Sequence, residues 1–156
     1  MLSTGPAPNP EFYTIWNYRR HIMLNGLFPQ RCAILNECTL NGTLKADSEP
    51  KAINELLTDE LAMTFAALKK HPKVYWIWNH RRWCLENIPL GSDGEDGDEQ
   101  GWRKTHWGRE LLIVEKMLEA DARNCAHTLF LYHSHCSHEL QFTHGTIAGM
   151  CSQACR

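Results

Sequence analysis

The sequence lacks the features that mark membrane-spanning, secreted and nucleic-acid-binding proteins. It contains no run of eighteen apolar residues, so we expect no membrane span. Its first residues, MLSTGPAPNPEF, lack a basic region followed by an apolar stretch, so we expect no secretory signal. The formal charge is only −2, which provides no general attraction to nucleic acid or to anionic lipid.

The chain also lacks a disulfide framework and strand-like alternation. Its seven cysteines are odd in number and show no framework spacing. Without a secretory signal they are expected to be reduced thiols in a cytoplasmic protein. Apolar residues make up 43% of the 156 residues and charged residues 22%, which is typical of one globular domain with a core.

Apolar residues instead recur at spacings of three and four, which predicts helices. An Asn25-Gly26 pair is expected to end the first helix, because glycine readily adopts the left-handed conformation of a helix end. Segments 27–48 and 91–101 interrupt the pattern, and the second, with five acids and four glycines, is expected to be a mobile loop. The sequence therefore predicts an all-α fold, with helices over residues 11–24, 49–70, 74–87 and 102–122.

An internal repeat is the most informative feature of the chain. PEFYTIWNYRR, residues 10–20, aligns without a gap with PKVYWIWNHRR, residues 72–82, and seven of the eleven positions are identical. Self-similarity of this kind is typical of stacked helical hairpins, each of which cannot bury its apolar face alone. We therefore expect an α-α superhelix of antiparallel hairpins.

The repeated residue types suit a scaffold. Each tryptophan lies three and four positions before an arginine pair, on one face of its helix. The indole can be buried between hairpins, while a guanidinium stacks on it and its planar fork binds carboxylates or helix-end carbonyls. The predicted scaffold residues are Trp16, Asn17, Arg19 and Arg20 in the first copy and Trp78, Asn79, Arg81 and Arg82 in the second.

The second copy follows the pattern P-x-x-Y-x-x-W-x-x-R-x-W, which resembles the repeats of protein prenyltransferase alpha subunits. The runs PEFYTIWNYRRHIMLNGLFP, LKKHPKVYWIWNHRRWCLE and WGRELLIVEKMLEADARN look most like a fungal-type alpha subunit of Rab geranylgeranyltransferase, in truncated form. The resemblance covers residues 9–124, which we expect to be partial alpha-subunit repeats. It implies a crescent of helical hairpins that wraps a separate beta subunit.

The resemblance also implies the chemistry and the partners. Geranylgeranyl would pass from geranylgeranyl diphosphate to C-terminal cysteines of Rab GTPases, which an escort protein presents. Zinc is expected on the beta subunit, where it activates the thiol, and magnesium commonly assists the diphosphate. This chain would bind no cofactor itself, and the fragment alone is expected to be inactive.

Lys73 is the residue for which the resemblance implies a role in catalysis. The first copy has Glu11 at the corresponding position. In related enzymes the lysine of K-x-Y-x-x-W-x-H-R-x-W lies near the prenyl diphosphate, and Lys73 fills that position here. A cation there would stabilise the leaving group as its charge grows, although a solvated lysine on a first helical turn is the alternative. Tyr75 and His80 could line the entrance to the same diphosphate site, or they could simply pack against other residues of the fold.

Residues 125–156 depart from the family pattern. A third W-x-Y-R-R motif should place a tryptophan at position 128, where Thr128 stands. Only Glu139 and Arg156 are charged in this tail. One interpretation is a metal site, although the spacing matches no known zinc pattern. The other, which we favour, is an aberrant or disordered tail produced by a frame change or a retained intron. The candidate ligands are His133, His135, Cys136, His138 and Cys151.

Two alternatives to a Rab geranylgeranyltransferase alpha subunit stay open at the sequence level. One is the alpha subunit shared by farnesyltransferase and type I geranylgeranyltransferase. Asn17 and Asn79, where that subunit carries histidine, favour the type II enzyme. The other alternative is a non-enzymatic helical-repeat module that binds a partner peptide on its concave face.

Overall fold

The computed structural model describes residues 12–30, 48–92 and 98–121, and no strand occurs among them. The all-α prediction is confirmed. Most helix ends lie within two residues of the predicted ones, which is the usual uncertainty of a helix boundary. The helices are α1 (Tyr13–Ile22), its π-helical continuation η1 (Met23–Leu27), α3 (Ser48–Lys70), α4 (Tyr75–Glu86) and α5 (Gly101–Ala120).

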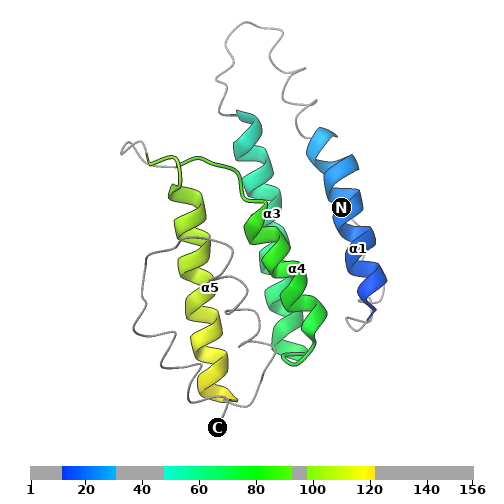
Figure 1. Cartoon of the computed structure of the whole chain (residues 1–156), viewed down its shortest axis with the longest axis vertical. Helices are drawn as coiled ribbons and strands as arrows, with labels where there is room; N and C mark the ends of the chain where they lie inside the picture. The colour runs from blue at the N-terminus through cyan, green and yellow to red at the C-terminus, as the bar shows by residue number, and fades with distance from the viewer. Residues whose placement is uncertain (1–11, 31–47, 93–97, 122–156) are drawn as a thin grey trace, which may run out of the picture.

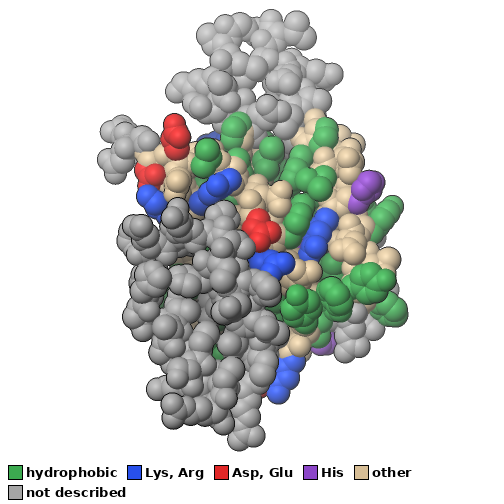
Figure 2. All heavy atoms as spheres, viewed as in Figure 1, with side chains coloured by type: hydrophobic (Ala, Val, Ile, Leu, Met, Phe, Trp, Pro, Cys, Tyr) green, Lys and Arg blue, Asp and Glu red, His purple; other side chains and the backbone are tan. Residues whose placement is uncertain are grey.

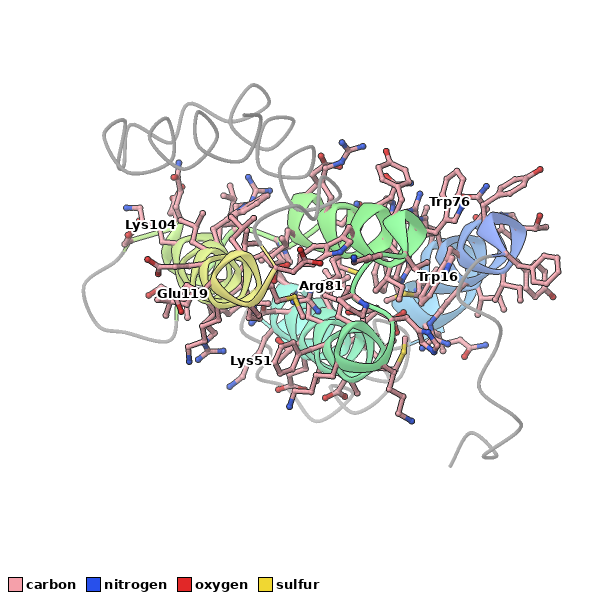
Figure 3. The ribbon with its side chains drawn as sticks, turned by 90° about the horizontal axis from the view of Figure 1, so that it is seen from below. Trp16, Lys51, Trp76, Arg81, Lys104 and Glu119 are labelled. Atoms are coloured by element: carbon pink, nitrogen blue, oxygen red, sulfur yellow. The ribbon has the colours of Figure 1, made fainter. Side chains whose placement is uncertain are left out.

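α4 is the central helix of the arrangement, because it packs against α1, α3 and α5. α3 and α4 form an antiparallel hairpin, α5 runs antiparallel to α4, and α1 runs in the same direction as α4 (Figure 1). Viewed along the helices, α1 and α5 flank the α3–α4 hairpin on opposite sides (Figure 3). The predicted stack of antiparallel hairpins is therefore present.

The core forms where the apolar stripes of these helices meet. Trp107 and Val114 of the α5 stripe are buried, and Leu111 and Leu118 pack against them at the edge. On α3 the stripe buries Leu57, Leu61 and Leu68. One contiguous cluster results, as expected for a single core. Its buried members are Trp16, Met23, Leu57, Leu61, Leu68, Ile77, Trp78, Cys84, Leu85, Ile88, Trp102, Trp107 and Val114.

The predicted end of the first helix at Asn25-Gly26 is wrong. The backbone continues as the π-helix η1 through both residues, and Phe28 still has helical angles, φ −64° and ψ −53°. A π-turn takes up one extra residue and so rotates the residues that follow it around the helix axis. Met23 is buried, and Leu27 and Phe28 pack against the core. The extra residue therefore keeps the apolar residues before and after Gly26 on the face that meets the core.

The turn between α3 and α4 is fixed by the second motif tryptophan. The indole Nε1 of Trp78 donates a hydrogen bond of 3.1 Å to the carbonyl of Pro72. α4 begins at Tyr75, after the N-cap residue Val74, so Pro72 lies in the turn and not in the first helical turn. A buried indole needs such an acceptor, and here the acceptor also fixes the approach of the chain to α4.

The ends of the acidic loop 91–101 are tied together, although residues 93–97 lie outside the described part. Gly91 donates to the carbonyl of Glu99 at 2.6 Å and accepts from Trp102 N–H at 2.9 Å. Gly91 has a φ of +156°, and a Cβ added there would lie 2.3 Å from the Trp102 ring. Glycine is therefore required where the loop crosses this indole.

No helix among the described residues is long and apolar enough to cross a membrane. The predicted boundary between residues 9–124 and 125–156 stays a prediction, because residues 122–156 lie outside the described part of the chain. The same holds for the metal and disorder interpretations of that tail.

Candidate functional site

The two copies of the repeated motif lie on helices that touch one another, α1 and α4. Trp16 and Trp78 are both buried, as the scaffold interpretation requires. Trp16 lies between α1 and α4, and Arg81 points into the space enclosed by α3, α4 and α5 (Figure 3). The motif residues therefore mediate contacts between helices.

The first arginine of copy one binds a carboxylate on α3. Arg19 of α1 donates from Nε and Nη2 to the two carboxylate oxygens of Glu60 on α3, with 2.6 Å for the Nη2–Oε2 bond. Glu60 is buried, whereas the Arg19 side chain is 41% exposed. A two-point pair fixes both the distance and the orientation of the two side chains.

The first arginine of copy two makes the same contact one hairpin later. Arg81 of α4 donates from Nε and Nη2 to the two oxygens of Glu110 on α5, with 2.8 Å for the Nε–Oε1 bond. Its Nη1 donates to the Leu61 carbonyl at 2.6 Å and to Thr64 Oγ1 at 2.8 Å. Arg81 thus joins α3, α4 and α5 through one buried guanidinium.

Sequence reasoning missed Glu60 and Glu110, although a signal for them exists. Each glutamate stands inside an apolar stripe at positions i, i+3, i+4 and i+7: Leu57, Glu60, Leu61, Thr64 and Trp107, Glu110, Leu111, Val114. A carboxylate on the buried face of a helix needs a cation, and the repeated arginine supplies one in each copy.

His80 adds a third helix to the contact at Glu60. Its Nε2 lies 2.7 Å from Glu60 Oε1, and its Nδ1 accepts a 3.2 Å hydrogen bond from Arg20 Nε. Because Nδ1 accepts from a guanidinium, the ring proton belongs on Nε2, which donates to Glu60. Arg19, Arg20, Glu60 and His80 form what we call the Glu60 cluster, which holds α1, α3 and α4 together.

Burial and charge shift the pKa values of the Glu60 cluster. Burial lowers the pKa of His80, and the Glu60 carboxylate only partly offsets this, so the ring stays neutral at neutral pH. Burial alone would raise the pKa of Glu60, but the hydrogen bonds from His80 and Arg19 outweigh it and hold the pKa below its ordinary value. The hydrogen bond to Glu60 raises the pKa of Arg19. The cluster therefore contains one carboxylate, two guanidinium cations and a neutral imidazole.

Aromatic rings enclose the imidazole and one guanidinium. His80 stacks on Trp83, with ring centroids 5.6 Å apart, and contacts the Trp16 ring at 4.8 Å. The Arg20 guanidinium lies over Trp83, 5.8 Å from the ring centroid, which is within cation–π range. A guanidinium does stack on a tryptophan, but the ring beneath Arg20 is Trp83 of α4, which is not one of the two repeated tryptophans for which the stacking was expected.

The remaining scaffold residues lie closer to solvent. Arg82 donates from Nη2 to Asn79 Oδ1 at 3.3 Å and lies 3.5 Å from Glu86 in an i,i+4 ion pair. Asn17 is exposed on α1. Half-exposed pairs of this kind contribute much less to stability than buried ones, so the second arginine of copy two is the less important of its pair.

Lys73 and Tyr75 lie at the amino-terminal end of α4. The Lys73 side chain is 72% exposed, and its Nζ lies 3.0 Å from Asp121 Oδ2, just beyond α5. Tyr75 is exposed and meets the Trp76 ring edge-on at 5.3 Å, and Trp76 in turn contacts Tyr13 at 5.4 Å. Hydrophobic side chains gather over this end of α1 and α4 (Figure 2). We call Tyr13, Tyr75 and Trp76 the aromatic patch.

The three side chains that the sequence offered as catalytic candidates are therefore not equivalent in their surroundings. Lys73 and Tyr75 are open to an approaching molecule, whereas His80 is buried in the Glu60 cluster. Their roles toward a substrate stay predictions. The candidate metal ligands of the tail lie outside the described residues.

Comparison with known proteins identifies relatives of the repeat. Residues 57–88 match the family model described as protein prenyltransferase alpha subunit repeat. The chain is 38% identical over 117 residues to the geranylgeranyl transferase type-2 subunit alpha of Candida albicans. The matched region covers 74% of this chain and 24% of that protein. It is 37% identical over 116 residues to the Saccharomyces cerevisiae protein of the same name, and this matched region covers 74% of this chain and 25% of that protein.

A mammalian relative extends this similarity. The geranylgeranyl transferase type-2 subunit alpha of Mus musculus is 28% identical over 116 residues, 74% of this chain and 15% of that protein. The chain thus spans about a quarter of the length of the fungal relatives that it matches. No solved structure matches the chain.

Proposed function

Because this chain belongs to the protein prenyltransferase alpha-subunit family, we propose that it serves as part of the alpha subunit of a Rab geranylgeranyltransferase. In this role it associates with a beta subunit in the cytoplasm. The assembled enzyme transfers geranylgeranyl from geranylgeranyl diphosphate to C-terminal cysteines of Rab GTPases, which an escort protein presents.

The observation that carries the proposal is the similarity to type-2 alpha subunits, which extends over three quarters of the chain. The arginine–glutamate contact that forms twice within this region supports it. All the relatives named above carry the type-2 name, which favours this enzyme over farnesyltransferase and the type I enzyme.

The buried charged groups support a scaffold role for this chain. Glu60, Arg81 and Glu110 join one helix to another, and each is engaged by side chains of the bundle itself. The chemistry of thiol activation would then belong to the beta subunit and its zinc ion, with magnesium assisting the diphosphate.

The exposed end of α4 is the surface that we assign to the substrate side. Lys69, Lys70 and Lys73 lie exposed within five residues of chain, beside the positive end of the α4 dipole. Lys73 would stabilise the negative charge that grows on the diphosphate as the bond to the prenyl group breaks. Tyr75, which is also exposed and two residues further along the chain, would contact the same substrate. His80 would act through the Glu60 cluster, by holding α4 against α1 and α3.

Co-expression with a type-2 beta subunit tests the proposal. Purification through a tag on this chain is expected to recover the beta subunit. Transfer of geranylgeranyl to a Rab–escort protein complex is then measured with the recovered material. The matched variants are Arg81→Ala, which breaks the scaffold, and Arg82→Ala, which leaves it intact. Failure to recover any beta subunit with the wild-type chain would refute the assignment.

A further inference from the structure

Lys73 is held by an acidic side chain from the far end of another helix. Its Nζ lies 3.0 Å from Oδ2 of Asp121, which directly follows the last residue of α5. The Lys73 and Asp121 side chains are 72% and 39% exposed. The ion pair therefore connects the α3–α4 turn to the end of α5 at the surface, where an approaching anion can compete for the lysine.

The position of Asp121 explains why it needs a cation. Its backbone N–H donates to the Met117 carbonyl at 3.0 Å, so its carboxylate stands at the carboxyl end of α5. That end of a helix carries partial negative charge and disfavours a further anion. Lys73, in contrast, stands just before α4, whose amino-terminal end carries partial positive charge and favours anions. Each side chain therefore carries a charge of the same sign as the partial charge of the helix end beside it, and the opposite charge of the other side chain offsets this.

We propose that Asp121 is a built-in counter-ion of Lys73, which a diphosphate must displace in order to bind this lysine. The inference rests on the proposed function, because it takes the assignment of Lys73 to a prenyl diphosphate as its starting point. In the free protein the carboxylate neutralises Lys73 and holds its side chain toward α5. When a diphosphate arrives, Lys73 exchanges one anionic partner for another, and Asp121 opposes binding by repulsion.

The effect of Asp121 on affinity is modest because the pair is exposed. Exposed ion pairs contribute up to about 1 kcal/mol, which corresponds to about a two- to fivefold change in a dissociation constant. Asp121 would thus adjust the affinity for the diphosphate and ease release of pyrophosphate after the transfer.

Glu119 provides a matched control on the same helix. It is exposed, lies two positions before Asp121 and carries the same charge. Glu119→Gln and Asp121→Asn therefore remove the same charge from α5, but only the second removes the partner of Lys73. A general change in the field around the bundle end would affect both variants alike.

The test is a titration of the full chain with sodium pyrophosphate at low ionic strength, followed by the backbone amide NMR signals of residues 73–76. Asp121→Asn is expected to tighten binding about two- to fivefold, and Glu119→Gln to leave it unchanged. Lys73→Ala is expected to weaken binding and to abolish the effect of Asp121→Asn in the double variant.

Three results would overturn the inference: no pyrophosphate binding by the wild-type chain, equal effects of the two α5 variants, or the same tightening by Asp121→Asn without Lys73. Each is independent of beta-subunit recovery. A chain that recovers the beta subunit but shows any of these results keeps the proposed function and loses this inference. A chain that shows the expected titration but recovers no beta subunit loses the proposed function instead.

Discussion

Arg81 and Glu110 form a two-point ion pair in the interior of the bundle, where their side chains are 2% and 3% exposed. The pair joins α4 to α5, and the remaining donors of Arg81 bind α3. Arg19 and Glu60 repeat the arrangement between α1 and α3, nearer the surface. In each copy the first arginine of the motif binds a glutamate on a neighbouring helix, α3 for Arg19 and α5 for Arg81.

Removal of Arg81 is expected to be far more damaging than removal of its neighbour. Arg81→Ala leaves Glu110 buried without its cation, which should lower the free energy of unfolding by about 3–5 kcal/mol. Arg82→Ala removes only a half-exposed pair with Glu86 and should cost less than about 1 kcal/mol. Urea unfolding followed by tryptophan fluorescence measures both values. Equal losses in the two variants would mean that burial of the pair has no energetic consequence.

Stability should fall as the pH is lowered, beginning near the ordinary pKa of histidine. The pKa of His80 is lowered from 6.5 in the folded chain, so below that pH the unfolded state binds a proton that the folded state refuses. The contribution of His80 is therefore present above pH 6.5 and is lost as the pH falls toward the folded pKa. The free energy of unfolding should therefore be lower at pH 5.5 than at pH 7.5.

The lowered pKa of Glu60 adds a second loss, which begins below its ordinary value of 4.5 and has the same sign. Urea unfolding at several pH values, carried out on His80→Gln, separates the two. This variant should show a smaller pH dependence between pH 7.5 and 5.5 than the wild type, whereas His71→Gln in the exposed turn should show the wild-type dependence. A wild-type chain equally stable at both pH values would contradict the account of the Glu60 cluster.

Two glycine substitutions should have opposite effects. Gly91→Ala places a methyl group where the Trp102 ring lies and requires a backbone conformation that side chains disfavour, so it should cost at least about 1 kcal/mol. Gly108→Ala in α5 meets no atom within 4 Å and should stabilise the protein by about 0.5–1 kcal/mol. Thermal unfolding measures both. Stabilisation by Gly91→Ala would show that the loop does not cross Trp102 as described.

Cys84 should resist thiol reagents until the protein unfolds. The thiol is buried in the core, and burial raises its pKa well above the ordinary range, with a smaller contribution from Glu60. Labelling with iodoacetamide at pH 8, followed by peptide mass spectrometry, should modify Cys84 only when urea is added. Rapid modification of Cys84 in the native protein would contradict its burial.

Much of the scaffold could be predicted from the repeat, because burial of paired tryptophans and apolar stripes requires only local spacing. The helices follow from the apolar spacing, and the burial of Trp16 and Trp78 and the guanidinium–carboxylate pairing follow from the repeat. The partners of the arginines were not predicted, because Glu60 and Glu110 lie on helices outside the motif and meet it only after folding. The signal for these partners was a glutamate inside an otherwise apolar helical stripe, which the prediction from local sequence patterns did not use.

The end of the first helix was mispredicted for a different reason. Asn25-Gly26 stops many helices, but glycine also tolerates the wider π-turn, and the core contacts of Leu27 and Phe28 favour continuation. Tertiary packing decided between two local conformations that the sequence alone leaves open.

A double-mutant cycle on Arg81 and Glu110 tests the central claim most directly, because it isolates the coupling between the two side chains. Arg81→Ala, Glu110→Ala and the double variant are compared with the wild type by urea unfolding at pH 7. We predict a coupling free energy of about 2–3 kcal/mol, with the double variant little worse than either single one. A coupling below about 0.5 kcal/mol would contradict the claim that the repeated arginine holds neighbouring helices together through its glutamate.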